Sequence, residues 1–325
     1  MTKASVGIDV SKNKLDVALL LSTMKVRKKT FPNDLTGFQN LYLWVQHHHK
    51  GGFHFCTEFT GVYDEAVSEF LYDKGQLVSR VNVMVIKSFA RLMLARTKTD
   101  KKDAFVIAQY CKTHDPKPWK PDPAHLKILR DLSRTLESLK EVRQDLLNRL
   151  EKYQNQESPA KRAWQDCVKD MDKRIKEVEK QLKDHIKNHP DLKEKVSLLE
   201  TIPGIGETTA RTLLAEIPDI ENFKSARQLA AFAGLNPCQR QSGSSVNGRS
   251  RLSKVGSKRL RKALYMPAIV ATSYNPIIMK FTNTLLNRGK CKMSAIGAAM
   301  RKLLHIVFGV LKSQQTFCEK KCLKI

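Results

Sequence analysis

The last third of this 325-residue sequence has almost no acidic side chains. No aspartate or glutamate occurs between Asn222 and Cys318, a stretch of 97 residues that contains 17 lysines and arginines. Over the whole chain, 58 basic residues against 32 acidic ones give a net charge of +26. Such a large excess of positive charge repels itself unless a polyanion lies against it. A solvated basic face or a membrane-surface patch are the alternatives. The interleaving of basic residues with glycine and serine favours the phosphate backbone of nucleic acid.

Several other features are missing, and each absence excludes a class of protein. No run approaches 18 apolar residues, so we expect no membrane span and no membrane partner. The N-terminus enters an apolar, strand-like run at once and lacks the segments of a secretory signal. The seven cysteines are odd in number and scattered, as is typical of reduced thiols in a cytosolic protein; Cys318 and Cys322 have no second pair that would complete a zinc set. No Gly-rich GxxxxGK[ST] loop is present, which argues against an ATP-driven helper or a helicase.

In the first 110 residues, strand-like runs alternate with helical patterns. We expect two strands, at 6–10 and 15–21, joined by a polar turn, and then a helix at 35–48 and a strand at 54–58. Residues 60–63 lead into a helix that ends at Tyr72, and a strand at 76–81 and a helix at 86–94 follow. A further amphipathic helix begins near Asp100 and runs to about Cys111. This alternation predicts an α/β domain with a mixed sheet.

Leucines at heptad spacing follow a proline-rich boundary. Prolines 116, 118, 121 and 123 break the chain, and apolar residues then repeat with three-then-four spacing over 129–150 and again over 168–182. Two long helices of nearly balanced charge suggest a coiled-coil hairpin or an oligomerising arm. A simple helical spacer explains the same pattern equally well.

The chain becomes helical again from Val196. The segment Gly204-Ile205-Gly206 lies between two predicted helices, as in a helix–hairpin–helix turn that brings backbone N–H groups close to a phosphate. An ordinary tight turn between helices needs the same glycines. A basic Ser/Gly loop at 241–258 and two helices at 260–272 and 295–312 complete this part. We therefore expect an α/β plus all-α protein with domains at 1–118, 119–195 and 196–325.

Four carboxylates stand out by their context. Asp9 lies within an apolar strand, Glu58 ends a strand, and Asp100 and Asp103 share one face at a helix start. Two divalent cations at a phosphodiester need several carboxylate oxygens that converge on one point. Alternatively, Asp100 is a helix cap, Asp103 is favoured by the helix dipole, and the other two are edge or turn charges.

A serine in the basic loop is the second candidate for chemistry. Ser242 is followed by glycine and lies between arginines, which suits attack on a phosphodiester whose charge the arginines neutralise. A flexible loop that only clamps DNA has the same composition. The residues that we expect to bind nucleic acid are Gly204, Gly206, Arg240, Arg249, Arg251, Lys254, Lys258, Arg259, Arg261 and Lys262.

Taken together, these segments resemble a known family. GIDVSKNKLDV around Asp9, TEFTGVY around Glu58, and RTKTDKKDA with Asp100 and Asp103 are similar to its N-terminal signature. IPGIGETTARTLLAEI, ARQLAAFAGLNP and SGSSVNGRSRLSKVGSKRLRKALYMPA are similar to its C-terminal signature. The family is that of the DEDD transposases of the insertion-sequence-110 type, bridge-RNA-guided recombinases that include Piv-type DNA invertases. The resemblance spans nearly the whole chain.

The resemblance implies a RuvC-like, RNase-H-type N-terminal domain whose carboxylates bind Mg²⁺, here Asp9, Glu58, Asp100 and Asp103. It implies a C-terminal transposase domain whose serine attacks the phosphodiester, here Ser242, with Ser244 and Ser245 as adjacent alternatives. The implied partners are target and donor DNA, a noncoding guide RNA, and further copies of the chain in a dimer or tetramer. The implied location is the bacterial cytoplasm, in association with the nucleoid.

Two other functions fit the same residues. In a RuvC-like junction-resolving nuclease, an activated water attacks the phosphodiester and Ser242 is a bystander. In a non-catalytic nucleic-acid-binding protein, the carboxylates are only caps and turns. Transposase and invertase need the same chemistry, so the chain leaves that choice open.

Overall fold

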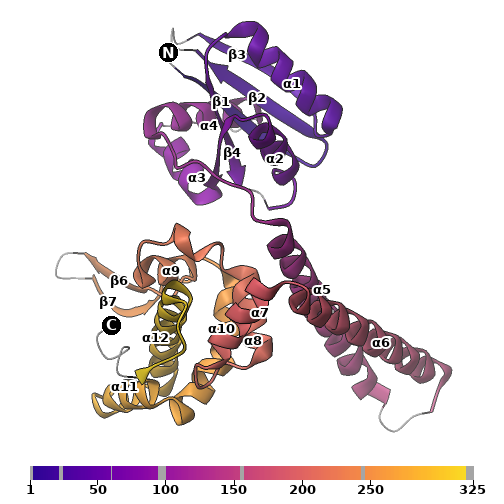
Figure 1. Cartoon of the computed structure of the whole chain (residues 1–325), viewed down its shortest axis with the longest axis vertical. Helices are drawn as coiled ribbons and strands as arrows, with labels where there is room; N and C mark the ends of the chain where they lie inside the picture. Colours follow the sequence, from indigo (N-terminus) through magenta and orange to yellow (C-terminus); the bar gives the residue numbers. More distant parts are fainter. Residues whose placement is uncertain are drawn as a thin grey trace. The chain divides into compact units, whose positions relative to one another are not determined.

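The computed structural model describes residues 3–21, 25–59, 61–93, 100–153, 157–242 and 246–319, without the side chains at 100, 101, 240, 242, 246, 247 and 249. The chain divides into two compact units, Met1–Pro121 and Asp122–Ile325 (Figure 1). The predicted division of the second unit near residue 195 stays a prediction.

The first unit is built on a five-stranded mixed sheet. Its strands are β1 (Ala4–Val10), β2 (Lys14–Leu20), β3 (Val26–Pro32), β4 (Phe53–Phe59) and β5 (Leu77–Asn82), in the order β3-β2-β1-β4-β5. β1, β2 and β3 pair antiparallel, whereas β4 is parallel to both β1 and β5. The predicted α/β unit with a mixed sheet is therefore confirmed. The sequence prediction missed β3, and it began β2 one residue too late.

Strand residues alternate between the two faces of this sheet. On one face, Ile8, Leu15 and Phe55 belong to a core with α1 (Leu35–His48) and α2 (Glu65–Asp73). On the other face, Ala18 and Leu20 pack against α4 (Asp100–His114), and α3 (Val83–Leu92) lies beside α4. Side chains of β1 and β4 that point toward α4 therefore come from every second position, which includes Asp9 and Glu58.

The second unit has one hydrophobic core that continues from its long helices into its shorter ones. Leucines of α5 (Ala124–Leu150) and α6 (Pro159–Lys187), such as Leu129 and Leu182, share this core with the later helices. Those helices are α7 (Pro190–Glu200), α8 (Glu207–Glu216), α9 (Ala226–Phe232), α10 (Lys258–Tyr274), α11 (Pro276–Asn287) and α12 (Lys292–Ser313). Figure 1 shows α5 and α6 side by side. Ser158 caps α6 by accepting a hydrogen bond from Lys161 N at 3.2 Å.

One predicted loop in this unit is a β-hairpin. Strands β6 (Pro237–Ser242) and β7 (Val246–Leu252) pair antiparallel, with an irregularity between Cys238 and Arg240. The expected Ser/Gly loop at 241–258 was wrong over most of its first half. The described side chains of both strands are exposed except Leu252, which is half-buried, so the glycine and serine content carries no apolar alternation that would mark a strand pair.

Helix α12 has the length and composition of a membrane-crossing helix, the single such helix among the described residues. More than half of its apolar window is buried within the protein. Its residues Leu303, Leu304 and Val307 have no exposed surface and lie in the core of the second unit. These contacts are those of a core helix.

Candidate active site and nucleic-acid interface

Asp9 and Glu58 lie next to each other on neighbouring parallel strands. The register pairs Gly7 with Cys56 and Ile8 with Thr57, so the next positions of the two strands are Asp9 and Glu58. Both side chains are partly buried. Both lie near the carboxyl ends of the central strands β1 and β4, a common location for ligand sites in open α/β sheets.

Helix α4 crosses this face of the sheet with its first turn toward the two acids. A Cβ added to Gly7 would lie 2.2 Å from Ala104 O and 2.3 Å from Ala108 N, so the helix backbone contacts β1 directly. Further along α4, Cys111 Sγ donates to His54 O at 3.5 Å, at the amino end of β4. The helix thus runs antiparallel to β1 and β4. Asp103, one residue before Ala104, therefore lies on the turn of the helix that approaches the carboxyl ends of the strands.

Asp9, Glu58 and Asp103 thus come from three elements that pack together at one end of the sheet. Asp100 is the first residue of α4, but its side chain lies outside the described part of the structure. Among the described side chains, no three His, Cys, Asp or Glu groups are arranged to hold a metal ion. Asp9, Glu58 and Asp103 each offer carboxylate oxygens, the ligand type that Mg²⁺ takes.

A fifth carboxylate, Asp16, lies beside Asp9 and Glu58 on the neighbouring strand β2, so that the three acids form a row across the sheet. The sequence analysis missed it. It lies directly opposite Asp9 in the β1–β2 register and is only 3 % exposed. Oδ1 accepts a hydrogen bond from Thr30 at 2.7 Å, and Oδ2 forms an ion pair with Lys14 at 2.9 Å. The available signal was the alternation Leu15-Asp16-Val17, in which one acid interrupts an apolar strand. This strand is joined by a short polar turn to the strand that contains Asp9.

Ser242 is the last residue of β6, where it pairs with Val246 at the end of the hairpin. Its side chain, and those of Arg240 and Arg249, lie outside the described part, as do Ser244 and Ser245 entirely. Arg240 pairs with Gly248, and Arg251 with Cys238, on the same two strands. The hairpin therefore carries three of the predicted nucleic-acid-binding arginines and the candidate serine on adjacent backbone segments.

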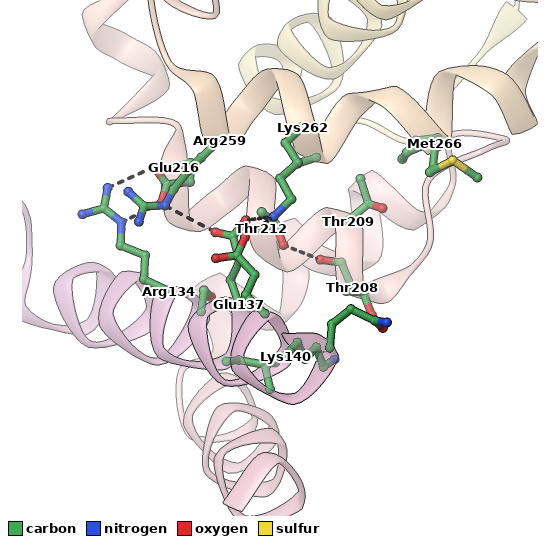
Figure 2. A pocket seen from close by; sticks show the side chains of 16 residues that line it. Arg134, Glu137, Lys140, Thr208, Thr209, Thr212, Glu216, Arg259, Lys262 and Met266 are labelled. Carbon is green, nitrogen blue, oxygen red and sulfur yellow. Dashed lines mark hydrogen bonds and ion pairs between the residues drawn. The ribbon is translucent and has the colours of Figure 1, made fainter. Parts of the chain in front are cut away.

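The predicted basic residues at the start of α10 are partly engaged inside the protein. Lys262 Nζ forms ion pairs with Glu137 at 2.7 Å and Glu141 at 2.6 Å, both on α5, and Arg259 pairs with Glu137 at 3.3 Å (Figure 2). Burial acts against ionisation of Glu137, but hydrogen bonds from Lys262 and Arg259 hold its pKa below the ordinary value. The hydrogen bonds that Lys262 donates to Glu137 and Glu141 raise the pKa of this lysine.

These ion pairs lie beside a cavity of about 440 Å³ between α5, α8 and α10. Figure 2 shows Arg134 and Glu216 at one side of it; Arg134 donates to both carboxylate oxygens of Glu216, at 2.7 and 3.0 Å. Thr208, Thr209 and Thr212 of α8 also line it. The cavity wall thus carries charges of both signs that are paired with each other.

The remaining predicted contacts differ in exposure. Lys254 and Lys258 are exposed, whereas Arg261 donates hydrogen bonds to Ala233 O and Gly256 O and so supports the local fold. Gly204 has φ +101°, and a Cβ there would lie 2.9 Å from the Cβ of Ala271 on α10. Gly206 is the exposed N-cap of α8, and a Cβ there would meet nothing within 4 Å. Gly204 is therefore required for packing, and the backbone at Gly206 remains accessible.

A mixed sheet with adjacent acids beneath a helix start, joined to a basic helical unit, is suited to chemistry on a DNA phosphodiester, the chemistry of DNA transposases and recombinases. Two family models match this chain: one described as Transposase, of the DEDD IS110 type, over residues 6–159, and one described as Transposase IS116/IS110/IS902 family, over residues 196–283. The chain belongs to the family of IS110-type DEDD transposases and Piv-type invertases, as its resemblance predicted.

Curated relatives agree with this membership. The pilin gene-inverting proteins of Moraxella bovis and Moraxella lacunata are each 35% identical to the chain over 326 residues, which cover 98% of this chain and 98% of theirs. The transposase for insertion sequence element IS1328 of Yersinia enterocolitica is 39% identical over 99 residues, 30% of this chain and 27% of its own length. The similarity to the pilin gene-inverting proteins thus extends over both units.

Proposed function

We propose that this enzyme recombines DNA by cutting a strand with Ser242 and rejoining it, with the carboxylates Asp9, Glu58, Asp100 and Asp103 as the metal-binding group. The observation that carries the proposal is the placement of Asp9 and Glu58 side by side, beneath the start of the helix that carries Asp103. The first unit would then have the RuvC-like, RNase-H-type role expected from the sequence. Arg240, Arg249, Arg251, Lys254 and Lys258 would bind the DNA backbone beside Ser242.

Mg²⁺ is the proposed cofactor because every donor in the group is a hard oxygen ligand. When bound, Mg²⁺ supplies charge neutralisation at the scissile phosphate and favours ionisation of the attacking hydroxyl. The four carboxylates would hold the cations.

The cutting step is a transesterification. The Ser242 hydroxyl loses its proton, its oxygen forms a bond to phosphorus, and the bond from phosphorus to the 3′ oxygen breaks. The 3′ oxygen takes up a proton, and the 5′ phosphate remains as an ester on the serine. In the rejoining step, the 3′ hydroxyl of another strand attacks that ester and releases the serine. The number of ester bonds is conserved, which is consistent with a sequence that has no ATP-binding loop.

The partners that we propose are target and donor DNA, a noncoding guide RNA and further copies of this chain. The long helices α5 and α6 would form a coiled-coil arm that joins subunits, and the backbone around Gly206 would contact phosphate as in a helix–hairpin–helix motif. The names of the relatives favour two outcomes of one chemistry, inversion of a DNA segment and transposition.

A trapped protein–DNA adduct tests the proposal. The full chain is incubated with Mg²⁺, with a supercoiled plasmid that carries the genomic segment around its gene, and with RNA transcribed from that segment. We expect nicked DNA covalently bound to protein on a denaturing gel. Ser242→Ala should abolish the adduct, and Asp103→Asn should abolish it while DNA binding persists. Strand cuts without an adduct would favour a junction-resolving nuclease. Binding without any Mg²⁺-dependent nick would favour a non-catalytic protein.

A further inference from the structure

We infer that Lys14, which the buried carboxylate of Asp16 holds in place, contacts a phosphate of the scissile DNA strand beside Asp9 and Glu58 and positions the strand there. This contact requires no residue of the second unit. The inference rests on the proposed function, because it assigns Lys14 and Asp16 to the same site. Asp16 is a positioning residue that acts through Lys14. The ligand chemistry is a phosphodiester of the DNA backbone.

The register places this pair in the row of acids. Asp16 lies opposite Asp9 on β2, and Thr30 lies opposite Asp16 on β3. Directly opposed residues of antiparallel strands have their side chains on the same face, so Asp16 and Thr30 share the α4 face with Asp9. Lys14 is two residues before Asp16 and therefore lies on that face as well, at the end toward which α4 begins.

The partners of Asp16 indicate support of Lys14 rather than metal binding. One of its oxygens accepts from Thr30 at 2.7 Å, and the other contacts Lys14 at 2.9 Å. With both oxygens engaged and only 5 % of its side chain exposed, Asp16 has little room to turn toward a cation. A buried carboxylate is costly unless it is paired, so this geometry fixes the ammonium group.

Lys14 itself is accessible to a ligand. Its side chain is 47 % exposed although it is held at one end by Asp16. A DNA strand that enters the row brings a phosphate close to several carboxylates, and a cation fixed beside them offsets part of this repulsion. Lysine contacts phosphate as a compact point charge. The fixed orientation lowers the entropy that is lost when the contact forms.

The test is single-turnover cleavage of the plasmid described above by full-length variants. Lys14→Gln should lower the rate about 10- to 100-fold, as expected for a charge-assisted hydrogen bond to phosphate, and Lys14→Arg should retain it within about threefold. The matched control is Lys50→Gln, an exposed lysine just before the amino end of β4, at the opposite end of the sheet. It should cleave at the wild-type rate.

A double variant distinguishes positioning from a purely structural role. Asp16→Asn keeps an acceptor for Thr30 but removes the charge that holds Lys14, so it should slow cleavage by about 3- to 10-fold. If Asp16 acts through Lys14, adding Asp16→Asn to Lys14→Gln should slow cleavage no further. Multiplying effects would mean that Asp16 acts otherwise and would overturn that part of the inference.

Lysine labelling gives a readout that does not depend on cleavage. In the Asp103→Asn variant bound to the same plasmid segment, acetylation followed by mass spectrometry should show Lys14 protected by DNA and Lys50 unprotected. Equal labelling of Lys14 with and without DNA overturns the inference.

Asp9→Asn separates the two proposals: if it still cuts, the proposed function fails. If it is inactive while Lys14→Gln cuts like Lys50→Gln, only the role of Lys14 fails.

Discussion

Gly7 has no side chain, and α4 occupies the space that one would fill. A Cβ at this position would lie 2.2 Å from Ala104 O, well inside contact distance. Gly7→Ala should therefore push α4 away from β1, lower the free energy of unfolding by about 1–3 kcal/mol and slow cleavage, because Asp103 moves with the helix. Thermal melting and the plasmid assay measure the two effects.

Gly52→Ala is the control for that substitution. A Cβ at Gly52 meets only Lys3 Cγ, at 3.7 Å, which is ordinary contact. This variant should melt and cleave like the wild type. If Gly7→Ala behaved in the same way, the close packing of α4 on β1 would be contradicted.

His305 on α12 makes folding sensitive to acid. Burial lowers its pKa to about 4, and the nearby cations Arg301, Lys302 and Arg227 act in the same direction. The folded state therefore favours the neutral ring, and this contribution to stability is complete above about pH 6.5 and is lost as pH falls toward 4. His305→Phe should flatten the decline of unfolding free energy over that window. Denaturant unfolding at several pH values measures it, and an unchanged decline would contradict this prediction.

At the scale of elements, sequence patterns predicted those whose apolar residues have a clear period. The helix at 35–48 matches α1, and the central strands β1 and β4 were recognised with errors of a residue or two. β3 was missed because five of its seven residues are exposed before Phe31, so no apolar alternation marks this edge strand. The hairpin β6–β7 was missed because its strands are polar. Asp16 was missed because its partners come from register, which spacing alone does not give.

The junction of α5 with α10 gives a prediction about elements. Glu137 and Glu141 neutralise Arg259 and Lys262, which were expected to bind nucleic acid. Glu137→Gln combined with Glu141→Gln should release both cations and tighten the binding of a DNA duplex of about 30 base pairs to the full chain. The salt dependence of this binding should become steeper by about one to two phosphate contacts. Fluorescence anisotropy at several salt concentrations measures this.

Glu179→Gln is the control for the junction. It removes an acid of α6 that pairs with Lys140 at 2.8 Å on the same helix α5, but it frees no cation of α10. The double variant removes two negative charges and Glu179→Gln removes one, so the salt dependence of the control should change by less than half as much. A change of half or more would mean that net charge alone sets the affinity.

At the scale of the whole molecule, the candidate chemical groups are divided between the two units. Asp9, Glu58, Asp100 and Asp103 belong to Met1–Pro121, and Ser242 belongs to Asp122–Ile325. The charge is divided in the same way, because the stretch without acids lies entirely in the second unit. The proposed metal-binding carboxylates and the proposed nucleophile therefore belong to different units of the chain. The proposed cutting step requires that they meet, and an assembly of several subunits would allow them to meet across a subunit boundary.

Mixing two inactive variants tests whether the carboxylates of one subunit act together with the serine of another. Asp103→Asn lacks the carboxylate and Ser242→Ala lacks the hydroxyl, so neither should cleave alone. If each site combines the carboxylates of one subunit with the serine of another, a mixed dimer has one intact site, and an equal mixture should recover about a quarter of the wild-type sites. Asp103→Asn mixed with Asp9→Asn should recover none, since no pairing then provides intact carboxylates. Differently tagged chains verify that subunits exchange. If they exchange and the mixture of Asp103→Asn with Ser242→Ala still shows no cleavage, the four carboxylates and the serine of each site belong to one subunit.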